Sequence, residues 1–225
     1  MKIKNYSVLL LLMLLVSIAV AQSSEESRTR FGILAGVNFQ NLTGSDADGD
    51  KLTNDMITGF HAGVNVQIPI VPEFYFQPGL MFSTKGAENN GDGFSAKYKL
   101  AYIEVPMNFV YKASLGTGYV MVGFGPYVAY GVMGTLKFEG GDGTTEMDIV
   151  FQDVVETSDN PALPYLKAID VGANILAGYE MSSGVFLQLN SQLGMLDLSP
   201  EYKGIENDKS SLKNTGFGLS LGYRF

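Results

Sequence analysis

Apolar residues recur at every second position through most of this chain. Successive side chains of a β-strand point to opposite faces, so a period of two predicts strands with one apolar and one polar face. Eight segments follow this pattern: residues 30–42, 57–68, 73–85, 97–112, 119–138, 166–181, 185–196 and 216–225. Beyond residue 29 no stretch reads as a helix of ordinary length, so the expected fold class is all-β.

The chemistry of the two faces indicates what each one meets. In the last segment Phe217, Leu219 and Leu221 alternate with Gly218 and Ser220. Across the segments the polar face carries Gly, Ser, Asn, Gln and Tyr with a few isolated charges, which suits a confined, hydrogen-bonded interior better than open water. The pattern therefore predicts an eight-stranded antiparallel up-and-down transmembrane β-barrel with its large residues toward lipid. The alternative is a soluble, lipocalin-like barrel, which would need those large residues inside.

The connections between the predicted strands alternate in length. Those after the second, fourth and sixth segments are short, whereas residues 43–56, 86–96, 139–165 and 197–211 form long connections. Barrels of the outer membrane have short periplasmic turns and long extracellular loops. Both chain ends are therefore expected on the periplasmic side.

Five charged or titratable residues lie on the predicted inner face: Glu104, Asp170, Glu180, Arg224 and His61. A barrel of about eight strands is only wide enough for side chains to fill it. We therefore expect these residues to form an interior polar network that leaves no open pore.

The N-terminus predicts a secretory signal peptide over residues 1–21. Lys2 and Lys4 precede an apolar run, and the small residues Ala19 and Ala21 mark a cleavage site. A membrane anchor is the alternative, but the run is shorter than a spanning helix needs. A short polar lead (22–29) and the barrel domain (30–225) follow. The chain has no cysteine, which excludes disulfides and a lipidated N-terminal cysteine.

Charge excludes one class of partner and suggests another. Without Lys2 and Lys4 the chain has 13 basic residues against 23 acidic ones, a formal net charge of −10, which argues against nucleic acid. Most of the acids lie in the four long connections. A set of lysines lies next to those connections: Lys85, Lys97, Lys99, Lys137, Lys167 and Lys213. We expect this lysine collar to contact phosphates or acidic sugars of outer-leaflet lipid and lipopolysaccharide; solvated strand ends remain the alternative.

Three motifs suggest other chemistry and carry little weight. The stretch "SDADGDKLTND" is acidic, but Lys51 and Ile57 stand where a calcium loop starting at Asp46 needs Gly and Glu, so no metal site is assigned and weak calcium binding stays open. His61 is the only histidine; a buried, hydrogen-bonded imidazole is expected, and pairing with Ser83 in a lipid-modifying enzyme is the outside alternative. No helix follows the glycine-rich stretches, so no nucleotide cofactor is expected.

The stretches "YIEVPMNFVYK", "GFGPYVAYG" and "LSLGYRF" resemble the PorT-like outer-membrane β-barrel family. Glu104 and Pro106 match its strand motif, Gly125 and Pro126 the following strand, and Phe225 its terminal aromatic residue. The resemblance covers residues 31–225 and implies the barrel fold and an outer-membrane location. It also implies that the terminal aromatic strand, with Tyr223 and Phe225, is the signal recognised by the barrel-assembly machinery.

The expected function is that of a non-enzymatic outer-membrane barrel with acidic extracellular loops and a structural, adhesive or envelope-assembly role. One alternative is a component of a protein-secretion system, which would need an envelope protein partner. A small diffusion channel is another, disfavoured by barrel size.

Overall fold

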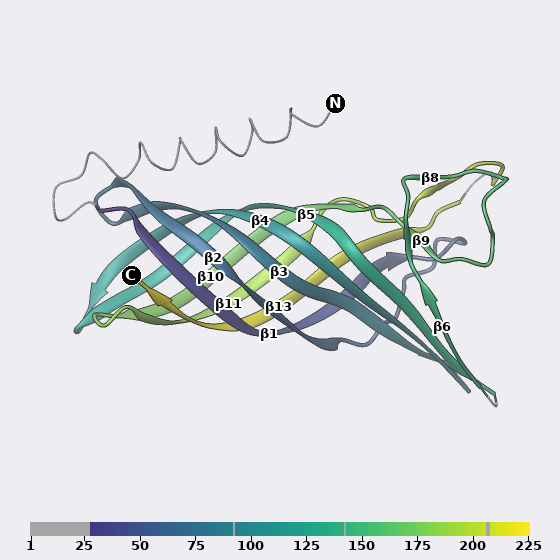
Figure 1. The fold of residues 1–225 in the computed structure, drawn as a ribbon, viewed down its shortest axis with the longest axis horizontal. Helices are drawn as coiled ribbons and strands as arrows, with labels where there is room; N and C mark the ends of the chain where they lie inside the picture. Colours follow the sequence, from purple (N-terminus) through teal and green to yellow (C-terminus); the bar gives the residue numbers. More distant parts are fainter. Residues whose placement is uncertain (1–27, 92, 142, 206–207) are drawn as a thin grey trace, which may run out of the picture.

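The computed structural model describes residues 28–91, 93–141, 143–205 and 208–225. The predicted signal peptide and most of the polar lead lie outside this range. Eight strands form a closed ring (Figure 1): β1 (Arg30–Ser45), β2 (Ile57–Val71), β3 (Phe74–Gly91), β4 (Phe94–Leu115), β5 (Gly118–Gly140), β10 (Ile169–Met181), β11 (Val185–Gly194) and β13 (Ser211–Arg224). Each strand pairs antiparallel with the next, and the predicted eight-stranded barrel is confirmed.

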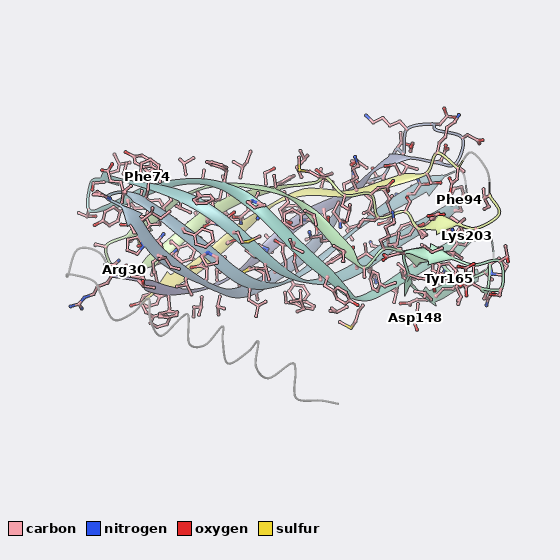
Figure 2. All side chains as sticks on the ribbon, turned by 90° about the horizontal axis from the view of Figure 1, so that it is seen from above. Arg30, Phe74, Phe94, Asp148, Tyr165 and Lys203 are labelled. Atoms are coloured by element: carbon pink, nitrogen blue, oxygen red, sulfur yellow. The ribbon has the colours of Figure 1, made fainter. Side chains whose placement is uncertain are left out.

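The ring closes between its first and last strands. β1 pairs with β13 from Gly32 opposite Arg224 to Ser45 opposite Ser211. The start of β1 and the end of β13 therefore lie side by side, at the same end of the barrel as the short turns after β2, β4 and β10. We call this the turn end and the opposite one the loop end. Figure 2 shows Arg30 and Phe74 at the turn end and Phe94 and Lys203 at the loop end.

Several strands continue beyond the predicted bounds at the loop end: β3 by six residues, β13 by five, β1 and β4 by three each, and β5 by two. β3 and β4 stay paired from Gly86 opposite Lys99 to Gly91 opposite Phe94, and β5 runs on into the hairpin strand β6 (Gly143–Asp148). The prediction of loops over residues 86–96 and at the start of 139–165 was therefore wrong. The ladder hydrogen bonds continue there, and cross-strand packing such as the stacked rings of Phe94 and Phe138, with centroids 5.8 Å apart, supports them.

Two small parallel strand pairs belong to the remaining loop segments. β7 (Val150–Phe151) pairs with β9 (Tyr165–Leu166), and β8 (Val154–Val155) pairs with β12 (Glu201–Tyr202). The β8–β12 pair brings the connection after β6 and the connection after β11 together beside the loop end (Figure 1). We call this assembly the cap.

Apolar side chains cover the outside of the ring. Phe124, Ile175 and Leu189 are 66%, 62% and 60% exposed, whereas Asn38, Gln67 and Ser220 on the inner face are 3%, 1% and 0% exposed. This is the reverse of a soluble barrel, so the lipocalin-like alternative is wrong. Among the described residues no helix is long and apolar enough to cross a membrane.

Candidate functional site

One cluster of buried charges occupies the turn end of the interior. Glu180 accepts hydrogen bonds from Lys112 Nζ and Arg224 Nε, both at 2.8 Å, and Arg30 lies 3.8 Å away at the rim. Arg224 also donates to Asn65 Oδ1 at 2.9 Å. Glu180, Lys112 and Arg224 lie on different strands, each at a position of the alternation that faces the interior. A single carboxylate thus serves three cations.

A second cluster lies toward the loop end and has the opposite charge balance. Lys85 Nζ lies 3.1 Å from Asp170 Oδ2 and 3.2 Å from Glu104 Oε2. Asp170 accepts further hydrogen bonds from Tyr127 and from Asn214. Here one ammonium group serves two carboxylates. Buried charges are tolerated only when paired and hydrogen-bonded, and every one of these charges is.

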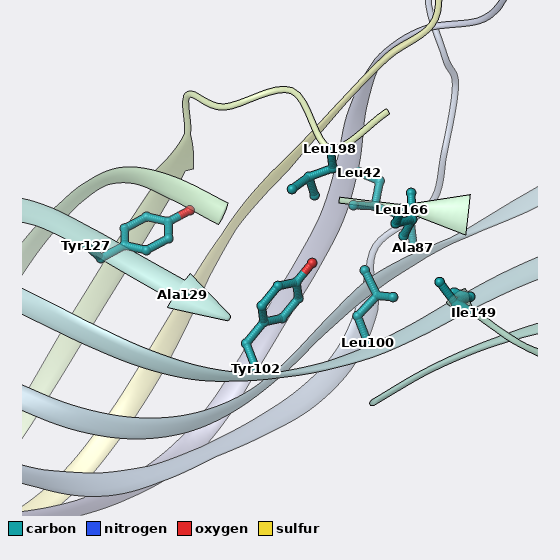
Figure 3. Close-up of a cluster of buried hydrophobic side chains, with 9 residues drawn as sticks. All are labelled: Leu42, Ala87, Leu100, Tyr102, Tyr127, Ala129, Ile149, Leu166 and Leu198. Atoms are coloured by element: carbon teal, nitrogen blue, oxygen red, sulfur yellow. The ribbon is translucent and has the colours of Figure 1, made fainter. Parts of the chain in front are cut away.

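Two apolar layers accompany the charged clusters. The side chains of Leu34, Met81, Val110, Met121, Leu176 and Phe186 form the layer next to the turn-end cluster. At the loop end Leu42, Leu100 and Tyr102 from the barrel meet Leu166 and Leu198 from the connections above it (Figure 3). This second layer seals the barrel under the cap. The interior is therefore filled along its length by alternating apolar and charged layers.

A small polar cavity of about 80 Å³ remains between the two apolar layers, and His61 lines it. His61 Nε2 lies 2.7 Å from Ser220 Oγ, which also accepts a hydrogen bond from Asn190 at 2.7 Å. Ser83 stands opposite His61 in the β2–β3 register, but its hydroxyl accepts a hydrogen bond from Asn38 instead. The imidazole is thus buried and hydrogen-bonded, in a cavity far smaller than the roughly 300 Å³ at which ligand pockets begin.

The five residues predicted for the interior network are all buried, but they fall into separate groups. Glu180 and Arg224 meet at the turn end, Glu104 and Asp170 meet near the loop end, and His61 lies between them. The prediction missed Lys112, which pairs with Glu180, and Lys85, which pairs with both Glu104 and Asp170. Position parity could have revealed them, because Lys112 is eight residues after Glu104 and Lys85 is two after Ser83, each on the polar face of its strand.

The lysine collar requires a correction. The side chain of Lys85 is 0% exposed and cannot contact lipid, because it points inward to Asp170 and Glu104. Lys97 and Lys99 lie near the start of β4 and Lys137 near the end of β5, all toward the loop end. Lys97 pairs with Glu88 at 2.8 Å and Lys137 with Glu139. Of the other five lysines, Lys99 is exposed and the rest are half-buried.

The acidic stretch after β1 uses its first carboxylate for its own turn. Asp46 Oδ1 accepts hydrogen bonds from the backbone N–H groups of Asp48, Gly49 and Asp50 at 2.9 to 3.1 Å. This is the Asx-turn arrangement, which closes a loop without any ion. Among the described residues no group of three or more His, Cys, Asp or Glu is placed to hold a metal ion.

The terminal strand is paired to its end. Phe225 N–H donates to Phe31 O at 2.8 Å, and the rings of Tyr223 and Phe225 pack edge to face with centroids 4.9 Å apart. Phe225 is 68% exposed on the outside of the barrel. Tyr223 and Phe225 are thus accessible to a protein that approaches the turn end.

Comparison with known proteins gives one family and several similar folds. The family described as "Outer membrane protein beta-barrel domain" matches residues 20–200. The solved structure of Ail, the attachment invasion locus protein of Yersinia pestis, is 11% identical with a TM-score of 0.39, over 87% of this chain and 99% of Ail. Neisserial surface protein A is 12% identical with a TM-score of 0.42, over 87% of this chain and 97% of its own. No curated protein gives a significant match.

The family match spans most of the chain and covers seven of the eight ring strands from β1 to β11. It agrees with the closed ring, the apolar outer surface and the filled polar interior. The chain belongs to the outer membrane protein beta-barrel domain family.

Proposed function

We propose that this protein is a non-enzymatic surface protein of the outer membrane, with its turn end in the periplasm, its loop end outside the cell, and an adhesive or envelope-supporting role. The observation that carries the proposal is the filled interior. Between the two apolar layers only a cavity of about 80 Å³ remains, so we assign function to the surfaces of the barrel and not to a channel through it.

The cap is the surface that suits a contact outside the cell. Its strand β12 presents the exposed Glu201, whose pKa is lowered by a hydrogen bond from Lys203 at 2.9 Å. Asp153, Glu156 and Asp159 belong to the connection that includes β8, and Asp153 and Glu156 are exposed. We therefore expect binding partners of the cap to be cationic or to bridge through cations.

Attachment of cells tests this proposal. Cells carrying the wild-type protein are compared with cells lacking it and with cells carrying Asp153→Asn, Glu156→Gln and Glu201→Gln together. We expect wild-type cells to attach to a polylysine-coated surface and to neighbouring cells more than either comparison strain. Equal attachment of all three strains, with the barrel variant present in the outer membrane, would contradict an adhesive role of the cap.

Lipid of the outer leaflet is the partner we propose for the remaining lysines of the collar. Lys97 and Lys99 line a groove of about 340 Å³ on the barrel together with Phe60 and Met133. Basic groups above an apolar floor suit an anionic headgroup with an acyl chain. Replacing Lys97, Lys99, Lys137, Lys167 and Lys213 by Gln should lower the lipopolysaccharide that copurifies with the barrel, and unchanged retention would contradict the proposal.

A secretion component of PorT type is the second candidate. Its support is the resemblance of the strand motifs at Glu104 and Pro106, and it needs a protein partner at the turn end. Pull-down of the folded barrel separates the candidates, because a secretion component should capture a periplasmic or envelope protein through turn residues such as Ser182 and Ser183. Loss of secreted proteins in cells without the barrel would support this second role.

A further inference from the structure

The turn end of the barrel contains a cavity of about 770 Å³ that is unlike the rest of this acidic protein. Four cations line it: Arg28, Arg30, Lys112 and Arg224. None of the described residues that line it has an acidic side chain. Most acids of the chain lie in the connections at the opposite end.

The buried part of this cavity has an excess of positive charge. Lys112 and Arg224 are 5% and 0% exposed in their side chains, and both bind the same carboxylate of Glu180. Arg30 approaches that carboxylate to 3.8 Å from the rim, where its side chain is 53% exposed. The buried groups, two cations and one carboxylate, have a net charge of +1, and Arg30 at the rim raises the net charge of the cluster to +2. Phe225, which follows β13, also lines the cavity.

Neutral groups around the cations add hydrogen-bond donors. Lys112 Nζ lies 5.5 and 5.0 Å from the ring centroids of Tyr75 and Tyr119, so the ammonium group is held between two aromatic faces. Ser182 and Ser183, in the turn between β10 and β11, line the same cavity. Guanidinium groups offer paired N–H donors that match the oxygens of carboxylate and phosphate.

We propose that this cavity is a binding site for an anion of the carboxylate or phosphate class, with Arg30 as the rim residue that engages it and Lys112 and Arg224 as the positive floor. An anion there compensates the buried excess charge. In the orientation proposed above the site opens to the periplasm, but anion binding itself does not depend on that orientation or on any role of the cap.

Calorimetric titration of the purified full chain in detergent tests the site, with inorganic phosphate and acetate as probes at constant ionic strength. We expect saturable binding of at least one probe, and the probe bound more tightly assigns the ligand to the phosphate or the carboxylate class. Arg30→Gln should weaken that binding about tenfold, the ordinary effect of losing a charge-assisted contact. Arg30→Lys should weaken it less, because the charge stays.

Two controls make the result specific. Lys99→Gln removes an exposed cation near the loop end and should leave the affinity unchanged, which separates the site from net charge. Heat-modifiable gel mobility checks that each variant is folded. We expect the Arg30 variants to fold, because the Arg30 side chain is exposed at the rim. Absence of saturable binding by both probes, or equal affinity of wild type and Arg30→Gln, would overturn the proposal.

Discussion

Single residues decide which side of the barrel wall is lipid and which is interior. Leu219 is 39% exposed on the outer face of β13, while its neighbour Ser220 is fully buried against His61. A change in the chemistry of either residue therefore meets a different environment. Substitutions at adjacent positions therefore test which face of the strand meets lipid.

Leu219→Arg places a charge toward the bilayer. We expect it to destabilise the folded barrel by about 2 to 4 kcal/mol, the cost of an arginine facing lipid near the midplane. Urea unfolding in phospholipid bilayers, monitored by tyrosine fluorescence, measures the difference. Leu219→Ile is the matched control and should change stability little. An arginine variant as stable as the control would mean that this face does not meet lipid.

Glu180→Gln removes the only carboxylate bound to Lys112 and Arg224 among the described residues. We expect a loss of about 3 to 5 kcal/mol, because breaking a buried ion pair leaves uncompensated charge. The same unfolding measurement applies. Glu201→Gln, on the exposed cap pair with Lys203, should have no measurable effect. If both variants unfold alike, the turn-end cluster does not contribute to stability.

At the scale of the strands, the period of two predicted the ring and the parity of its faces. It did not predict where β3 ends or where β13 begins, since a strand that leaves the membrane can continue with polar residues such as Asn89 and Asn90. Lys85 was placed in the collar because it closed a predicted strand, although its parity with Ser83 put it on the polar face. The two charge clusters join residues from different strands, and the register between strands cannot be read from the sequence of any one strand.

The β1–β13 seam depends on close backbone approach at Gly36. A Cβ atom added there would lie 2.0 Å from Leu219 O and 2.8 Å from the Cα of Ser220. Gly36→Ala should therefore open or distort the seam and lower the fraction of chains that fold into detergent-resistant barrels. Gly143→Ala, where an added Cβ meets nothing within 4 Å, is the control. Equal folding yields of the two variants would contradict a tight seam.

The terminal strand carries a prediction about assembly. Deleting Phe225 removes one backbone hydrogen bond to Phe31 and the aromatic pair with Tyr223, but leaves the register of β13 intact. We expect the truncated chain to refold in detergent and to accumulate outside the outer membrane in cells. Fractionation of cells measures this, and normal delivery of the truncated chain would show that Phe225 is not part of the assembly signal.

At the scale of the whole molecule, the architecture separates three surfaces. An apolar belt surrounds the ring, a cationic cavity opens at the turn end, and the cap lies beside the loop end. The filled interior separates the two ends. Planar-bilayer recordings of the purified protein should therefore show no stable single-channel steps, and regular conductance steps would instead support a diffusion channel.

The central claim is that the chain folds as a closed barrel in the outer membrane. Heat-modifiable mobility of the protein in outer-membrane fractions tests this most directly, because closure leaves no strand edge for SDS to attack at room temperature. We predict that the unheated protein fractionates with the outer membrane and migrates differently from the boiled protein. A protein found in the soluble fraction, with the same mobility before and after boiling, would contradict the claim.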